Sequence, residues 1–220
     1  MTRLAGSARS LVGGILDLIF PPVCAGCGRV DTPWCPSCDR KLRAEPLDLR
    51  RRHLPPLQTS LATGLHDGIL QTAIHALKYD NVTAVIPALG DRMILALRQS
   101  GLSFDMIIPV PLFTLRIKER GYNQSQVVGS YMAQFMAQPV VSTALERHRH
   151  TASQVGLSHD ERQINVRGAF RANPLLVSKA TVLLLDDVMT TGATLQECAH
   201  ALLDAGANAV LSLTVTAALP

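Results

Sequence analysis

The sequence predicts an α/β protein whose mostly parallel sheet is flanked by helices and preceded by a small four-cysteine module. Apolar runs at 181–185 and 210–215 enclose a helical pattern, which is the order of a strand–helix–strand unit. Such a unit places both strands parallel in one sheet. Four of the five cysteines lie between residues 24 and 38. A chain of 220 residues with 47% hydrophobic residues can fill the core of one main domain beside such an appendage.

The chain divides by composition into three predicted parts. Residues 1–45 hold a predicted N-terminal helix and the cysteine module, and residues 59–220 form the main domain. Between them, residues 46–58 contain three prolines and three consecutive arginines and are predicted to be a linker. The formal net charge of +4 indicates anionic ligands only weakly.

The N-terminal apolar run superficially resembles an export signal. It spans Leu11–Val23 and follows two arginines, but Asp17 interrupts it and no small-residue cleavage site follows. The run is also too short to cross a bilayer. We therefore predict an amphipathic helix at 8–19 that packs on protein, no membrane span and a cytoplasmic protein.

The cysteines are spaced C-x2-C-x7-C-x2-C, which predicts a zinc site. Paired C-x2-C hooks allow four thiolates to surround one ion tetrahedrally, and the ligands are Cys24, Cys27, Cys35 and Cys38. Four protein ligands leave no open position on the metal, so the predicted role of the zinc is structural. Basic residues and Trp34 flank the hooks and also permit contact with nucleic acid.

The pattern of apolar residues predicts the elements of the main domain in order. Strands are expected where apolar residues run together, and helices where they recur every three to four positions. The predicted strands are 60–65, 104–110, 140–145 and the two runs named above, and the predicted helices are 67–78, 82–99 and 122–138. Residues 146–165 are polar and irregular, and a long polar segment within a domain is usually a functional loop.

Two adjacent carboxylates and a threonine-rich turn follow the strand at 181–185. Asp186 and Asp187 can accept hydrogen bonds from ribose hydroxyls. The turn and a helix N-terminus can hold a phosphate, through Thr190, Thr191, Gly192, Ala193 and Thr194. The alternative is a plain strand-to-helix turn with solvated acids, but acids at the end of a buried strand are costly without a partner. The turn lacks the sequences of the Walker A and dinucleotide motifs.

The helix after this turn has one apolar face. Its apolar residues recur with helical spacing and include Cys198, which we expect in the core rather than as a nucleophile. Thr194 and Glu197 have the spacing of a capping box at the helix start. Gly206 lies where the helix is expected to end.

A basic segment follows the predicted strand at 104–110. Arg116, Lys118 and Arg120 lie in it, and guanidinium groups are well suited to phosphate oxygens. Between residues 116 and 171 there are eight Lys or Arg and four Asp or Glu residues. A basic segment at 116–171, together with the acid pair and the threonine turn, fits a ligand with several phosphates. The alternative is that these basic residues form a solvated surface.

The combination of these segments resembles the ComF family, which joins a four-cysteine zinc module to a type I phosphoribosyltransferase domain. The resemblance covers nearly the whole chain. Besides the cysteines, it is carried by Ala76–Tyr79, by Pro109–Pro111 with Arg120–Gln124, and by the segment from Asp186 to Thr194. The polar loop at 146–165, with Thr151, Gln154, Leu157, Ser158, Arg162 and Asn165, also fits.

The resemblance implies a fold and a ligand. The fold is a twisted, mostly parallel sheet flanked by helices, and the ligand is phosphoribosyl pyrophosphate with Mg2+. Asp186 and Asp187 would orient the ribose and stabilise its developing charge, and residues 190–194 would anchor the 5′-phosphate. The loop from Pro109 to about Arg120 would hold pyrophosphate through Arg116, Lys118 and Arg120. Lys78 is a further phosphate contact, or else an exposed lysine at a helix end.

The resemblance leaves two main functional hypotheses open, beside a third in which the chain is a zinc-centred nucleic-acid binder with a vestigial domain. One is a phosphoribosyltransferase, with residues 146–165 as a loop that closes over the site. Purine-salvage relatives often carry an acid where this chain has Thr190, so a purine acceptor that is deprotonated by that carboxylate is not expected here, and the acceptor is unassigned. The other is a non-catalytic accessory of DNA uptake in natural transformation. It would bind a nucleotide or single-stranded DNA and work with a helicase-like competence partner.

Overall fold

A computed structural model describes residues 21–149 and 165–219. The helix predicted at 8–19 and most of the polar loop predicted at 146–165 lie outside these ranges. Within them, no helix is long and apolar enough to cross a membrane.

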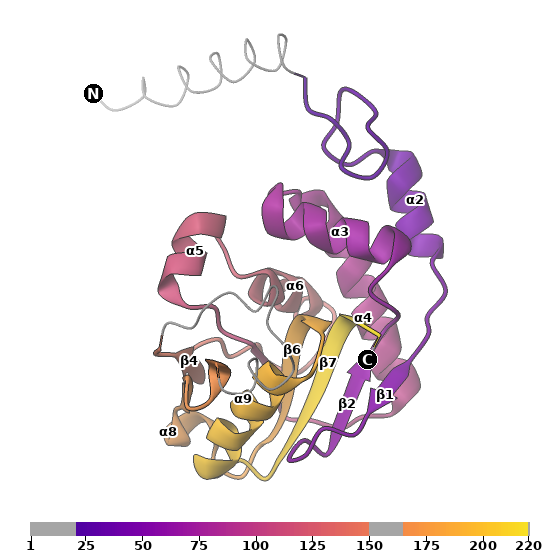
Figure 1. The fold of residues 1–220 in the computed structure, drawn as a ribbon. Coiled ribbons are helices and arrows are strands. Elements are labelled where there is room, and N and C mark those ends of the chain that lie inside the picture. Colours follow the sequence, from indigo (N-terminus) through magenta and orange to yellow (C-terminus); the bar gives the residue numbers. More distant parts are fainter. Residues whose placement is uncertain (1–20, 150–164, 220) are drawn as a thin grey trace, which may run out of the picture.

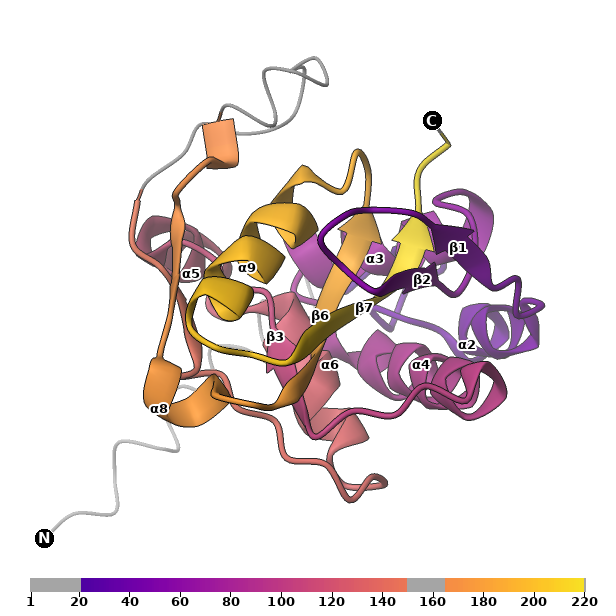
Figure 2. The ribbon, with the colours of Figure 1, turned by 90° about the horizontal axis from the view of Figure 1, so that it is seen from below.

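A five-stranded sheet forms the centre of the molecule, in the order β1-β2-β7-β6-β3 (Figure 2). Its strands are β1 (Arg50–Arg52), β2 (Thr59–Ala62), β3 (Met106–Pro109), β6 (Thr181–Met189) and β7 (Ala209–Ala217). Strands β2, β7, β6 and β3 pair in parallel, and β1 pairs with β2 in antiparallel fashion. The mostly parallel α/β fold predicted from the strand–helix–strand pattern is therefore confirmed.

Helices cover both faces of this sheet (Figures 1 and 2). On one face lie α3 (Gly68–Tyr79), α4 (Ile86–Ser100), which follows the 3-10 turn η1 (Thr83–Val85), and α6 (Gln124–Met132). Helix α9 (Ala193–Asp204) lies on the other face with α8 (Pro174–Val177) and a hairpin of β4 (Leu145–Arg147) and β5 (Phe170–Ala172). Two further helices of the described chain are α2 (Pro36–Ala44) and α5 (Thr114–Arg120).

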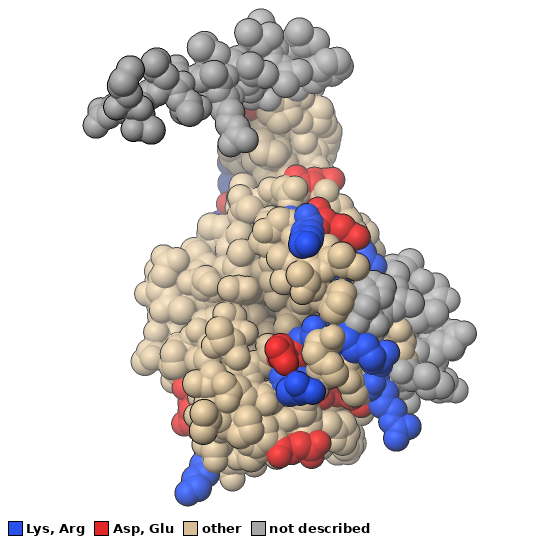
Figure 3. Space-filling model, turned by 90° about the vertical axis from the view of Figure 1, so that its left-hand side faces the viewer, with Lys and Arg blue, Asp and Glu red and all other residues tan. Residues whose placement is uncertain are grey.

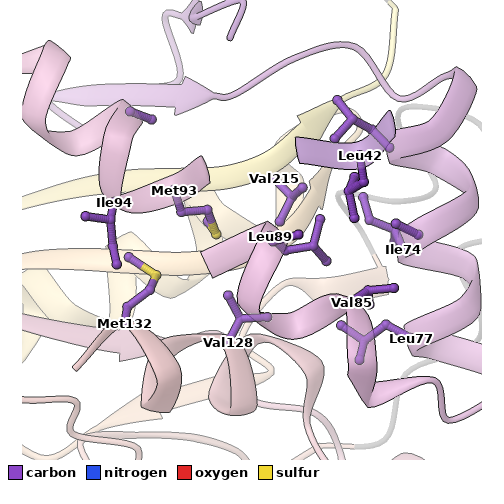
Figure 4. Packing of buried hydrophobic residues seen from close by; sticks show 14 of the residues in the cluster. Leu42, Ile74, Leu77, Val85, Leu89, Met93, Ile94, Val128, Met132 and Val215 are labelled. Atoms are coloured by element: carbon purple, nitrogen blue, oxygen red, sulfur yellow. The ribbon is translucent and has the colours of Figure 1, made fainter. Parts of the chain in front are cut away.

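The two central strands are buried on both faces, which explains their continuous apolar sequence. Along β6, Leu183 and Leu185 pack with α3, α4 and α6, and Val182 and Leu184 pack with α9. This alternation follows from the two-residue period of a strand. Figure 4 shows the first of these clusters, in which Met93 and Met132 fill the space between α4 and α6.

The cysteine module is attached to the main domain through α2. Leu42 of α2 is buried in the same cluster as Ile74 of α3 (Figure 4). Arg92 of α4 is also buried and donates hydrogen bonds to the carbonyl oxygens of Glu45, Pro46 and Thr63, each at 2.6 Å. These carbonyl oxygens satisfy the buried guanidinium donors. Since two of them belong to the segment that joins the module to the domain, Arg92 holds this segment against α4.

Four local predictions need correction. The helix predicted at 122–138 ends at Met132, because the chain must return to the edge of β3, where Val141 donates a hydrogen bond to Ile107. Of the strand predicted at 140–145, there remain a single bridge between Val140 and Ile107 and Leu145, the first residue of β4. The segment predicted as a linker contains β1, whose arginines add a strand to the sheet edge.

The fourth correction concerns the helix after the threonine turn. Its N-cap is Gly192 rather than Thr194, and Glu197 accepts a hydrogen bond from the backbone of Gly168 instead of closing a capping box. Glycine takes this position because its φ is +87°, which side chains disfavour. The predicted end is confirmed, since Gly206 follows the helix with a φ of +93°.

Candidate functional site

A cavity of about 600 Å3 opens at the carboxyl ends of the parallel strands. Its walls come from the end of β6, the turn into α9, the end of α3 and the segment from β3 through α5 to α6. Figure 1 shows α3 and α5 beyond the same end of the sheet. Parallel α/β sheets bind their ligands at this end, because loops from several strands converge there.

The predicted acid pair lies in this cavity and is already engaged in hydrogen bonds. Asp186 accepts hydrogen bonds from the Ser125 hydroxyl at 3.0 Å and from the backbone N–H of Asp187 at 2.9 Å. Asp187 forms an ion pair of 2.7 Å with Lys78, and both side chains are largely buried. Lys78 therefore joins the acid pair in the ligand-free protein, and its ammonium group has further donors to offer a phosphate.

Burial sets the protonation of Asp186. Asp186 borders the cavity and is partly buried, and this burial raises its pKa to about 7. The charge of Asp187 raises the pKa further, while Lys78 and the two hydrogen bonds oppose the rise. Near neutral pH the pair thus changes its charge by titration of Asp186.

This raised pKa predicts a pH-dependent stability. An aspartate titrates near pH 3.9 in the unfolded chain, so the folded state binds the proton more tightly and loses stability from about pH 4 to about pH 7. We expect the free energy of unfolding of the wild type to fall relative to that of Asp186→Asn as the pH rises from 5 to 7. Urea denaturation of both proteins at several pH values measures this difference. Asparagine can still accept both hydrogen bonds, so parallel stability curves would contradict the prediction.

The threonine turn is supported from behind by the segment around β1. Arg52 donates a hydrogen bond to the carbonyl of Thr190 at 2.5 Å and a second, shorter one to that of Ala218. The side chain of Leu54 lies against Gly192, where an added Cβ would come within 2.5 Å of it. Gln196 donates to the carbonyl of Pro55 at 2.8 Å. The predicted linker therefore holds the turn in place.

Most of the predicted phosphate-binding residues border the cavity. Of residues 190–194, the cavity is lined by Thr190, Gly192, Ala193 and Thr194. The hydroxyl of Thr191 instead accepts a hydrogen bond from the backbone of Ala193 at 3.3 Å. Among the described residues, Thr191 therefore stabilises the turn and does not form part of the cavity wall.

Three of the four cations predicted to bind pyrophosphate border the cavity. Lys78, Arg116 and Arg120 line the cavity, whereas Lys118 of α5 is not among its wall residues in the described chain. The segment from Pro109 to Arg120 was expected to be a loop, but its second half is helix α5. Figure 3 shows the side of the molecule on which α5 lies, with Lys and Arg side chains gathered in one area and acidic side chains among them.

The Arg120–Gln124 segment holds three parts of the site together. Tyr122 donates a hydrogen bond to the carbonyl of Leu77 at 2.6 Å, next to Lys78. Asn123 caps α6 and donates to the carbonyl of Val110 at 2.9 Å. Arg120 donates to the side chain of Gln124 at 3.1 Å. Much of this motif therefore positions α3, β3 and α6 around the cavity.

Some cavity residues were not predicted as site residues, although Tyr79 and Gln124 belong to segments that carry the family resemblance. They are His66, which precedes α3, His75 and Tyr79 of α3, Gln124 and Ser125 of α6, and Arg147 of β4. Arg147 stacks over Phe170, with 5.3 Å from its guanidinium carbon to the ring centroid. His75 and Tyr79 are spaced by one helical turn, and the helix predicted at 67–78 ends one residue before Tyr79, so this spacing was a usable signal for a shared face.

The four cysteines form a compact cluster, as predicted. Their sulfur atoms all lie within 4.8 Å of one another, and those of Cys27 and Cys35 are 3.6 Å apart. A tetrahedral site with Zn–S bonds of about 2.3 Å separates its sulfur atoms by about 3.8 Å. At Gly26 an added Cβ would lie 2.6 Å from the sulfur of Cys38, so the turn follows the cluster closely. These residues fit a zinc ion.

Backbone donors prepare part of the cluster for metal binding. The N–H of Cys38 donates to the sulfur of Cys35 at 3.5 Å, and this bond is the largest cause of a pKa lowered to about 6. Burial and the neighbouring sulfurs raise the pKa of Cys38 to about 12. The cluster thus holds thiolate and thiol forms together, and an ion bound by all four sulfurs would displace the remaining protons.

Cys198 is separate from this cluster. It is fully buried on α9, and burial raises the pKa of its thiol well above the ordinary value. A buried thiol of raised pKa is a poor nucleophile, which confirms its predicted place in the core.

Comparison with known proteins assigns the chain to a family. No protein-family model matches it. It is similar to DNA utilization protein YhgH of Escherichia coli K12, with 34% identity over 195 residues that cover 86% of each chain. The protein of the same name from Salmonella typhimurium LT2 is 32% identical over the same shares. Competence protein F of Haemophilus influenzae is 29% identical over 211 residues, covering 90% of this chain and 91% of that protein. With these relatives and its four-cysteine cluster, the chain belongs to the ComF family.

Proposed function

We propose that the chain binds phosphoribosyl pyrophosphate together with Mg2+ and transfers the phosphoribosyl group to an acceptor. One observation carries the proposal. A single cavity is lined by the acid pair at the end of β6, the threonine turn at the N-terminus of α9, and cations from α3 and α5. These are the complements of ribose hydroxyls, a 5′-phosphate and pyrophosphate.

The turn would bind the 5′-phosphate through backbone N–H groups at the start of α9. The helix dipole adds a favourable partial charge at this position. Arg52 and Leu54 hold the turn in its conformation before the ligand arrives, which lowers the cost of ordering it. Arg116 and Arg120 would bind the pyrophosphate, together with Lys78.

The acid pair would orient the ribose for displacement at the anomeric carbon. In that step a bond forms from the acceptor to the anomeric carbon, and the bond to pyrophosphate breaks with its electron pair leaving on the pyrophosphate oxygen. Asp187, and Asp186 once ionised, would stabilise the positive charge that develops on the sugar. The cations would bind the leaving group, and fixing both ends of the sugar would keep it aligned.

The residues at the cavity also suit Mg2+ carried by the ligand. Among the described residues, the only group of three or more metal-binding side chains is the cysteine cluster. A cation at the cavity would therefore rest on ligand oxygens and one or two carboxylates, which is the usual arrangement for Mg2+. When bound, Mg2+ would neutralise charge on the pyrophosphate.

Calorimetry with phosphoribosyl pyrophosphate tests this proposal. We expect binding in the presence of Mg2+ and weaker binding with EDTA, measured on the zinc-loaded full chain. Release of pyrophosphate is then assayed with a panel of free bases, nucleosides and single-stranded DNA as acceptors. An absence of binding would overturn the proposal as a whole.

A second candidate is a non-catalytic accessory of DNA uptake. The names of the relatives, a DNA utilization protein and a competence protein, favour it. In this role the chain would bind a nucleotide or single-stranded DNA beside a helicase-like partner. Binding of phosphoribosyl pyrophosphate without turnover of any acceptor would favour this candidate. An affinity for single-stranded DNA that falls steeply with salt and survives Asp187→Asn would place the DNA outside the acid pair.

A further inference from the structure

We propose that His66, His75 and Tyr79 form a binding surface for the nucleobase of a mononucleotide. This inference rests on the proposed function, because the phosphoribosyl part of the nucleotide would occupy the acid pair and the threonine turn. The nucleobase would be that of the product, or of the acceptor before transfer.

The three rings form one continuous wall of the cavity. The ring centroids of His66 and His75 are 5.9 Å apart, and those of His75 and Tyr79 are 5.5 Å apart in an edge-to-face arrangement. The guanidinium carbon of Arg120 lies 5.5 Å from the Tyr79 centroid. All four residues line the cavity, and the contact between Tyr79 and Arg120 joins the ring wall to α5.

This ring wall is not part of the hydrophobic core. His75 is exposed and Tyr79 is 62% exposed, although aromatic residues make up only 4% of the chain. An exposed tyrosine packed between a histidine and an arginine offers apolar ring surface to a ligand. His75 and Tyr79 are one turn apart on α3, so they face the same side of the helix.

The ring wall adjoins the place where the sugar is proposed to bind. Tyr79 follows Lys78, which contacts Asp187 at 2.7 Å. At the other end of the wall, His66 shares a hydrogen bond of 2.9 Å with the hydroxyl of Thr216, a residue of β7 paired with Val188 of β6. A base attached to a ribose at the acid pair would therefore lie within reach of the rings.

The chemistry of the rings favours a flat, uncharged heterocycle over a phosphate. Burial, and next the charge of Lys78, lower the pKa of His66, so this ring is neutral at physiological pH. A neutral imidazole can stack on a base and exchange a hydrogen bond with its edge, whereas it attracts a phosphate weakly. The cations needed for phosphates come from other parts of the wall.

Calorimetry with matched ligands tests the ring wall. The ligands are ribose 5-phosphate and the four common ribonucleoside 5′-monophosphates, titrated into the zinc-loaded full chain. We expect at least one monophosphate to bind about 5- to 150-fold more tightly than ribose 5-phosphate, the range given by stacking of one base on aromatic rings. Tyr79→Ser should remove most of this advantage, Tyr79→Phe should retain it, and neither should change the affinity for ribose 5-phosphate more than about twofold.

The control is Phe135→Ser, which removes another exposed aromatic ring outside the cavity wall and should change neither affinity.

Ribose 5-phosphate that binds with no gain from any base would overturn the ring wall and leave the proposed function standing. Failure of ribose 5-phosphate to bind at all would count against the proposed function itself. Equal weakening of both ligands by Tyr79→Ser would show that the ring only positions Lys78 or Arg120, and would overturn the nucleobase assignment. Tyr79-dependent binding of a single-stranded oligonucleotide without a 5′-phosphate, as tight as that of any monophosphate, would overturn the mononucleotide as the source of the base.

Discussion

Replacing Asp187 with asparagine is expected to weaken the binding of phosphoribosyl pyrophosphate by about 10- to 150-fold. This range corresponds to one charge-assisted hydrogen bond of about 1.5–3 kcal/mol, at about 1.4 kcal/mol for each tenfold change in affinity. Asparagine has nearly the same shape, so the change removes the charge that would hold a ribose hydroxyl. Calorimetry in the presence of Mg2+ measures the effect.

The direction of this change distinguishes a sugar site from a general anion site. Asp187 forms an ion pair with Lys78, so its removal frees a cation and takes away a negative charge beside the phosphates. If the cavity were a general anion site, Asp187→Asn would strengthen the binding of phosphoribosyl pyrophosphate. Pyrophosphate alone has no ribose for Asp187 to contact, so we expect it to bind the variant as well as or better than the wild type. A gain in affinity for phosphoribosyl pyrophosphate would refute the assignment of the acid pair.

Asp204→Asn is the matched control for this experiment. Asp204 ends α9, is exposed and lies outside the cavity wall in the described chain, and its substitution changes the net charge by the same amount. We expect unchanged binding of phosphoribosyl pyrophosphate. An equal loss in both variants would mean that net charge, not contact with the sugar, controls the affinity.

Replacing Cys38 with alanine is expected to abolish zinc binding and to unfold the cysteine module. The wild type should contain about one zinc ion per chain under reducing conditions, because four thiolates complete the coordination of the metal. Structural zinc contributes about 10–16 kcal/mol in small zinc-binding peptides, so three remaining ligands should not keep the module folded. Metal analysis of purified protein measures the stoichiometry, and less than about half an equivalent in the wild type would contradict the zinc site.

A single tryptophan reports on the folding of this module. Trp34 is the only tryptophan in the chain, and it is 6% exposed in the core cluster next to the cysteines. Its fluorescence emission should shift to longer wavelength in Cys38→Ala, as it should in the wild type after chelation of the metal. Cys198→Ala is the control, since this buried cysteine of α9 lies outside the cluster. It should keep its zinc and the wild-type emission.

Local patterns were sufficient to predict the acid pair, the threonine turn and the cysteine cluster. The apolar strand, the acid pair, the threonine turn and the helix lie within one continuous segment, so their order in the sequence is their order in space. The same holds for the cysteines, whose two hooks are close in the chain. The capping of α9 was predicted wrongly because Thr194 matches a capping pattern, while the positive φ of Gly192 places the start of the helix two residues earlier.

Contacts between distant segments could not be read in the same way. The hydrogen bond from Arg52 to Thr190 joins residues 138 positions apart, and that from Ser125 to Asp186 joins residues 61 positions apart. Each depends on strand order, which brings β1 and β7 to one side of β6 and β3 to the other. No local pattern distinguishes a supporting arginine on an edge strand from an arginine in a linker.

The amino-acid sequence by itself determined the α/β class, the strand–helix–strand unit with its acid pair and threonine turn, and the four cysteines. It could do so because strand and helix periodicity and metal-ligand spacing are properties of neighbouring residues. Only the tertiary structure decided that Lys78 pairs with Asp187, that Arg52 and Leu54 hold the turn, and that three rings of the β2–α3 region enclose the same cavity. These contacts arise where the carboxyl ends of parallel strands converge, and the packing of the whole sheet sets that convergence.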